Sequence, residues 1–78
     1  MKVKDIIQAL AMMKDINHVE FSGYGFAPIG YGLDSLLKCV KEDKEPILND
    51  DSCHHIEIRN NVATIYGCFE KYIKKVER

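Results

Sequence analysis

The chain has 78 residues, of which 46% are hydrophobic and 29% are charged, proportions that ordinary folded proteins share. This length allows a single domain, residues 1–78, with a modest core, and the composition excludes a disordered tail. The formal net charge of −1 excludes a strong overall attraction to nucleic acid or to an anionic membrane. We therefore expect neither of these partners.

Three features of the sequence indicate the cellular compartment: its apolar runs, its first residues and its cysteines. No apolar run is long enough to span a bilayer, and the first residues lack the apolar core of a secretion signal. The three cysteines are an odd number, which is typical of reduced thiols rather than of a disulfide framework. We therefore expect a cytoplasmic protein.

The first predicted element is an amphipathic helix over residues 2–14. Its apolar side chains follow the spacing of one helix face: Val3, Ile6, Ile7, Leu10 and Met13. Residues 18–22 then alternate in polarity with a period of two, which predicts a half-buried strand. In this strand His18 points away from the core.

A stretch rich in glycine and aromatic residues follows, at residues 21–32. It holds four of the chain's five glycines and four of its seven aromatic side chains. So many glycines are unusual in a helix or strand, and so many apolar side chains are unusual in a solvated linker, so the pattern predicts a compact loop. One interpretation is structural: the glycines supply turns while apolar side chains fold onto the core.

Two functional interpretations compete with this one. The loop could bind a partner protein, because exposed aromatic rings dominate interface hot spots. Its contact residues would be Tyr24, Phe26, Ile29 and Tyr31. Alternatively, backbone amides could hold a phosphate. That ligand loop would be formed by Gly23, Gly25, Gly30 and Gly32, whose spacing matches neither a dinucleotide fingerprint nor a P-loop.

A second helix is predicted over residues 34–43. Its apolar side chains are spaced three and four residues apart, Asp34 or Ser35 is available as the N-cap, and Pro46 prevents continuation. The polar residues 49–51 are typical of a turn in which side chains bind nearby backbone amides.

A β-hairpin is the clearest supersecondary signal in the chain. Two runs of alternating polarity, residues 54–59 and 62–66, flank Asn60 and Asn61, and Asn tolerates the positive φ of a two-residue turn. This register places apolar side chains on one face of the hairpin and polar ones on the other. It pairs Ile56 with Ile65 and Ile58 with Ala63. The polar face forms a secondary surface of His55, Glu57 and Tyr66.

Helical spacing resumes at Phe69 and continues to Val76, which predicts a third helix. The predicted order is α-β-α-β-β-α, in an α+β fold. We expect a small two-layer sandwich in which amphipathic helices cover a three-stranded antiparallel sheet. The strands that begin at His18 and His54 are its candidate exposed edges, and such an edge can accept a strand from a partner.

Cys53, His54 and Cys68 are the candidates for a metal site. The predicted hairpin register brings two thiols and an imidazole near one another, and zinc accepts these donors. However, the usual zinc spacings are missing, and neighbouring residues on a strand point to opposite faces. We therefore expect packed thiols, no metal and no other cofactor. The same neighbours are the best candidates for a cysteine nucleophile, but so small a domain is not expected to exclude water around them, so we expect no enzymatic activity.

The opening residues Met1-Lys2-Val3-Lys4-Asp5-Ile6-Ile7, followed by a helix and a short strand, resemble the start of small accessory proteins encoded by bacteriophages and prophages. That group includes anti-CRISPR and related anti-defence inhibitors, several of which are compact α+β domains without catalytic residues. The resemblance covers about the first twenty residues and carries over no functional residue. It implies an inhibitor that acts in the host cytoplasm. Inhibitors that imitate DNA are strongly acidic, whereas this chain has a net charge of −1. An inhibitor of this kind would therefore recognise its target by the shape of a surface such as the aromatic loop, and not by a negative field.

These observations favour a non-enzymatic protein-interaction domain that binds a host protein through the glycine-rich aromatic stretch, alone or as a homo-oligomer. Two alternatives stay open. One is a domain that binds or sequesters a small ligand such as a nucleotide or phosphate, and the other is a module stabilised by zinc.

Overall fold

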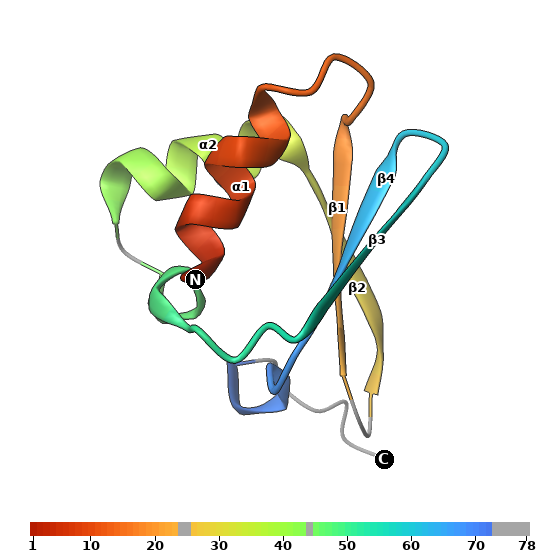
Figure 1. Ribbon diagram of the computed structural model, residues 1–78. Coiled ribbons are helices and arrows are strands. Elements are labelled where there is room, and N and C mark those ends of the chain that lie inside the picture. Colours follow the sequence, from red (N-terminus) through yellow and green to blue (C-terminus); the bar gives the residue numbers. More distant parts are fainter. Residues whose placement is uncertain (24–25, 44, 73–78) are drawn as a thin grey trace.

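The structure is a computed structural model that describes residues 1–23, 26–43 and 45–72, with the backbone alone described at 26, 27 and 70. Two helices, α1 (Val3–Ala11) and α2 (Leu33–Glu42), lie on one face of a four-stranded sheet (Figure 1). The strands are β1 (His18–Gly23), β2 (Phe26–Gly32), β3 (His55–Arg59) and β4 (Val62–Tyr66). Two short 3-10 helices are η1 (Pro46–Asn49) and η2 (Glu70–Tyr72).

The sheet is mixed, with the strand order β2-β1-β4-β3. Both outer pairs are antiparallel, whereas the central strands β1 and β4 run parallel. Across this central pair Val19 faces Ala63 and Phe21 faces Ile65, and all four side chains are buried. A parallel pair needs a long crossover connection, and here the crossover contains β2, α2, η1 and β3. The prediction of β1 as an edge strand is therefore wrong.

The predicted glycine-rich loop is wrong as well, because most of it forms the hairpin of β1 and β2. The two strands pair Phe21 with Ile29, and the register shifts after Phe21. A Cβ atom built on Gly30 would overlap Nε2 of His18, so glycine lets the imidazole lie against the strand backbone. This extra strand makes the sheet four-stranded and mixed instead of three-stranded and antiparallel. Tyr24 and Gly25 lie outside the described residues.

The hairpin of β3 and β4 has the predicted register. Ile56 lies opposite Ile65 and Ile58 lies opposite Ala63. Asn60 adopts a φ of 54°, as the two-residue turn requires. Strand β3 is also an edge strand, since β4 is its one neighbour in the described part of the sheet.

Both predicted helices are present with shifted ends. Helix α1 ends at Ala11 rather than at residue 14. It buries Val3, Ile6, Ile7 and Leu10 as predicted, but Met13 lies beyond the end of the helix and is 45% exposed, so its prediction as part of the buried face is wrong. Helix α2 has Gly32 as its N-cap without a side-chain hydrogen bond, so the prediction of Asp34 or Ser35 as the cap is wrong. It ends at Glu42, and its C-cap Asp43 has a left-handed φ of 54°. None of the described helices is long and apolar enough to cross a membrane.

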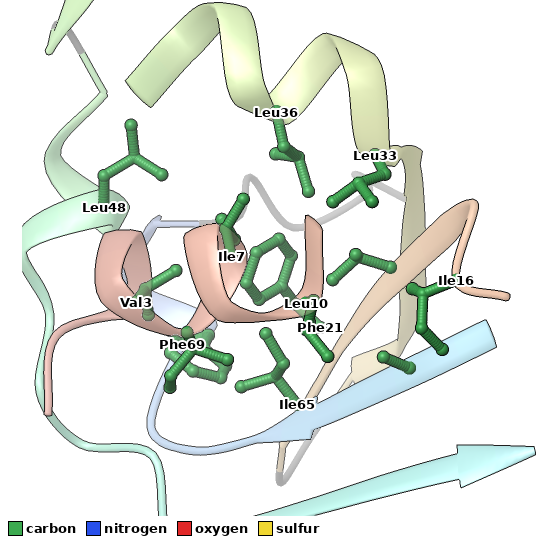
Figure 2. Close-up of a cluster of buried hydrophobic side chains, with 13 residues drawn as sticks. Val3, Ile7, Leu10, Ile16, Phe21, Leu33, Leu36, Leu48, Ile65 and Phe69 are labelled. Atoms are coloured by element: carbon green, nitrogen blue, oxygen red, sulfur yellow. The ribbon is translucent and has the colours of Figure 1, made fainter. Parts of the chain in front are cut away.

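The core lies between the two helices and the sheet (Figure 2). Phe21 and Phe69 meet edge to face at its centre, with ring centroids 5.3 Å apart. Phe69 is fully buried although it belongs to the segment that follows β4. Where a third helix was predicted, the structure shows the short η2, and residues 73–78, including Val76, lie outside the described part. The helices, strands, η1 and adjoining segments supply the core: Val3, Ile6, Ile7, Leu10, Ile16, Val19, Phe21, Leu33, Leu36, Leu48, Ala63, Ile65 and Phe69.

Gly67 allows the chain to pass closely over the Phe69 ring. A Cβ atom at this position would lie 2.7 Å from Cζ of Phe69 and 3.1 Å from Oγ of Ser52. Since the ring is buried, it cannot move aside freely, and we expect Gly67→Ala to lower the free energy of unfolding by about 1–3 kcal/mol. Urea denaturation measures this loss. In the control Gly32→Ala the nearest atom is 4.0 Å away, and the loss should stay below about 1 kcal/mol; equal losses would contradict the steric explanation.

Candidate functional site

A cavity of about 480 Å³ opens between β2, α2 and the two 3-10 helices. Its volume lies within the range of pockets that hold a small ligand or a partner's side chain. Most of its lining is apolar, with a few polar groups at intervals. The lining residues are Phe21, Tyr31, Ser35, Leu36, Cys39, Glu45, Pro46, Ile47, Leu48, Lys71 and Tyr72.

Tyr31 connects this cavity to the edge of the sheet. It lies opposite Val19 in the β1–β2 pair, so its side chain is on the helix-facing side of the sheet. Its ring packs edge to face on Phe21, with centroids 5.8 Å apart, and 42% of the residue remains exposed. Ile29 lies on the same side and is half-buried. Tyr31 is therefore held in place by the core while part of its surface stays exposed.

The edge of β2 also presents backbone hydrogen-bonding groups. The N–H of Leu33 donates to the carbonyl of Asn17 at 3.1 Å, which sets the alternation of hydrogen bonds along the β1–β2 pair. By that alternation the N–H and C=O of Gly30 and the N–H of Gly32 point away from β1. In the part of the chain that the structure describes, β2 has a neighbouring strand on one side only. These groups can therefore pair with an added strand.

The far wall of the cavity depends on the buried carboxylate of Asp50. The hydroxyl of Tyr72 donates to Oδ2 of Asp50 at 2.8 Å, and Nζ of Lys71 lies 3.6 Å from the same oxygen. Oδ1 accepts hydrogen bonds from the backbone N–H of Ser52, at 2.7 Å, and from the Ser52 hydroxyl. The turn predicted at residues 49–51 is thus confirmed at Asp50, which also attaches η2 to the rest of the domain.

The electrostatics of this wall follow from the same contacts. Burial would raise the pKa of Asp50, but the hydrogen bonds from Ser52 and Tyr72, together with the charge of Lys71, hold it below its ordinary value. Asp50 in turn raises the pKa of the Tyr72 hydroxyl by accepting its hydrogen bond. The contact with Tyr72, more than that with Asp50, raises the pKa of Lys71, whose ammonium lies 5.1 Å from the Tyr72 ring centroid. Lys71 is therefore a largely exposed positive charge beside the cavity.

The opposite face of the sheet carries the predicted secondary surface. The hydroxyl of Tyr66 donates to Oε1 of Glu57 at 3.2 Å, and Nε2 of His55 lies 3.3 Å from Oε2. The His55 and Tyr66 rings contact each other at a tilt of 37°, with centroids 5.4 Å apart. The pKa of Glu57 lies below its ordinary value, first because of the contact with His55 and then because of Tyr66. The structure therefore brings these three residues together as one exposed to half-buried cluster.

The other predicted contact and ligand residues are more dispersed. Gly30 and Gly32 lie in extended backbone without a positive φ, which is the geometry of a strand and not that of a phosphate-binding nest. Gly23 ends β1. Phe26 begins β2, and its side chain is among those that the structure does not describe.

The predicted metal candidates lie at the end of the β3–β4 hairpin. Cys53 is half-buried with its Sγ 3.7 Å from the carbonyl of His55, whereas His54 and Cys68 are exposed. The N–H of Cys68 donates to Oγ of Ser52 at 2.9 Å, and all three cysteines are free thiols. Within residues 1–23, 26–43 and 45–72, no three His, Cys, Asp or Glu side chains form a group that could hold a metal ion.

The cavity itself was missed by reasoning from the sequence, because its walls come from segments that are far apart in the chain. One local signal was available: Ile47 and Leu48 are apolar residues within a segment whose later residues, 49–52, are all polar. Leu48 is fully buried and Ile47 packs against the core. A pair of apolar residues after a proline thus marked one wall of the cavity.

Comparisons of this chain with protein-family models, with curated proteins and with solved structures gave no match. The resemblance of its first residues to phage accessory proteins therefore stays a prediction, as does everything that this resemblance implies about function.

Proposed function

We propose that this chain is a non-enzymatic protein-interaction domain that binds an extended segment of a partner protein along β2. The observation that supports this best is the position of the cavity beside β2, an edge strand among the residues that the structure describes, with the half-exposed Tyr31 between the cavity and this edge. A strand of the partner would pair with the outward backbone groups of Gly30 and Gly32. Because side chains of a strand alternate between its faces, one of them would enter the cavity.

The walls of the cavity define the chemistry of this partner segment. Phe21, Leu36 and Ile47 offer apolar surface, which suits a large aliphatic or aromatic side chain. Lys71 beside them suits an acidic group on the same segment. Backbone pairing then supplies affinity for any extended segment, and the cavity and the charge select among sequences.

We further propose that the partner is a host protein in the cytoplasm, and that binding blocks it, in the manner of an inhibitor encoded by a phage or another mobile element. The resemblance of the first residues supports this role. The small net charge supports recognition by shape rather than by a strong electrostatic field.

Filling the cavity should abolish this binding. Ser35 is an exposed residue of α2 that lines the cavity, so Ser35→Phe places a ring where the partner's side chain would enter. Peptides that bind the unmodified protein, selected from a random display library, should lose at least about tenfold in affinity for this variant. Fluorescence anisotropy measures the change. Lys38→Phe is the matched control, because Lys38 is exposed on the same helix and is not among the lining residues.

Two further measurements accompany these variants. Far-UV circular dichroism and thermal unfolding establish that both variants keep the fold. Amide resonances of Gly30 and Gly32 should shift when a selected peptide is added. Equal affinity for the two variants, or shifts restricted to β3, would show that binding does not use this site.

A further inference from the structure

Strand β3 forms the opposite edge of the sheet. In the described part of the chain its one neighbour is β4. Arg59 and Val62 flank the two-residue turn and therefore form a hydrogen-bonded pair. Because such pairs alternate along an antiparallel ladder, the backbone groups of Arg59, Glu57 and His55 point toward β4. The N–H and C=O groups of Ile56 and Ile58 therefore point away from the sheet.

The side chains of these two isoleucines are exposed too, to 37% for Ile56 and 45% for Ile58. They lie opposite Ile65 and Ala63, which are fully buried, so they continue the apolar layer of the core beyond the cover of the helices. In Figure 1 both helices lie away from β3. An edge strand with outward hydrogen-bonding groups and exposed aliphatic side chains is a template for pairing with another strand.

The side chains on the polar face of β3 indicate which partner strand can pair with it. It carries a basic, an acidic and a basic residue at every second position: His55, Glu57 and Arg59. When two β3 strands pair antiparallel through their outward groups, the possible registers differ in which residue lies on the twofold axis. The register centred on Glu57 sets two carboxylates opposite each other, which is unfavourable. Those centred on Ile56 or Ile58 instead set each Glu57 opposite a basic residue of the second copy.

We propose that two copies of this chain associate through β3, antiparallel about a twofold axis. Glu57 of each copy then faces His55 or Arg59 of the other, and both four-stranded sheets join into one. The four isoleucines form a continuous apolar strip on the helix-facing side. The contact is small, so the association is weak and reversible. It occupies the edge opposite to β2 and does not depend on the function proposed above.

Sedimentation velocity tests this association directly. Between about 1 µM and about 1 mM protein, we expect the 8.9 kDa chain to pass from monomer to dimer. Ile58→Lys places a charge in the apolar strip and should raise the dissociation constant of the dimer at least about tenfold. Met12→Lys, which replaces an apolar residue that is 86% exposed and outside β3, should leave it unchanged. A chain that stays monomeric throughout, or equal effects of the two variants, would overturn the proposal.

A charge exchange tests the pairing itself. Glu57→Arg sets an arginine opposite His55 or Arg59 in the two allowed registers, and His55→Glu combined with Arg59→Glu sets a glutamate opposite Glu57 in both, so each variant alone should be monomeric. Mixed in equal amounts, the two variants should recover a heterodimer, because the arginine introduced at position 57 then lies opposite a glutamate of the other variant in either register. Circular dichroism checks the fold of each. Variants that are folded but dimerise alone, or that fail to associate when mixed, would overturn the pairing.

Discussion

Replacing Phe69 by alanine is expected to lower the free energy of unfolding by about 3–5 kcal/mol. Its ring is fully buried and meets Phe21 edge to face, so the substitution leaves a large void at the centre of the core. A core in a domain of this size rarely supplies more than about 3–5 kcal/mol in total. Most molecules of Phe69→Ala should therefore be unfolded at 25 °C, and far-UV circular dichroism with urea titration should show this.

Tyr31→Ala is the matched control for this loss. Tyr31 also contacts Phe21 edge to face, but 42% of it is exposed, so less surface returns to water and no closed void forms. We expect a loss of about 1–2 kcal/mol and a chain that remains folded. If Phe69→Ala cost no more than Tyr31→Ala, the segment after β4 would not be part of the core. The wall of the cavity that includes Tyr72 would then have no fixed position.

In the elements that were predicted correctly, apolar residues recur at a regular spacing, because one face of each element is buried. Helix α1 and the β3–β4 hairpin each place apolar residues on one face. The hairpin has the predicted register, and α1 buries all of its predicted residues except Met13. Strand β2 was missed because Gly30, Gly32 and a proline are unfavourable for an isolated strand. A subtler signal was present: Val19 and Phe21 are mirrored by Ile29 and Tyr31 across a short glycine-containing segment. Such a mirrored alternation is typical of a hairpin.

The candidate site was less predictable than the fold. The sequence led to Ile29 and Tyr31 as contact residues, and the structure places both on the helix-facing side of β2, with Tyr31 in the cavity wall. It also grouped His55, Glu57 and Tyr66, because a two-residue period and a known turn determine which side chains share a face. The turn at Asp50 was predicted, but the cavity and the contacts of Asp50 with Lys71 and Tyr72 could not be derived in this way. They depend on packing between segments that are far apart in the chain.

Lowering the pH should destabilise the domain as the carboxylate of Asp50 becomes protonated. In the unfolded chain this group takes up its proton near the ordinary pKa of 3.8, whereas the folded pKa lies lower. The unfolded state therefore binds more protons between these two values, and stability rises with pH there. The contribution of Asp50 is complete above 3.8 and is lost as the pH falls through the folded pKa. Glu57, with its own lowered pKa, adds a parallel loss below 4.5.

Asp50→Asn isolates the part that belongs to Asp50. At neutral pH the variant should be less stable by about 1.5–3 kcal/mol, the range for hydrogen bonds to a charged group. Little of this should come from Lys71, whose side chain is largely exposed. Urea denaturation from pH 7 down to about pH 2 should give a shallower acid dependence for Asp50→Asn than for the unmodified chain. Glu57→Gln should remove a different part of the slope, and the double variant should remove both. An acid dependence that Asp50→Asn leaves unchanged would mean that this carboxylate does not hold η2, and with it the cavity wall, in place.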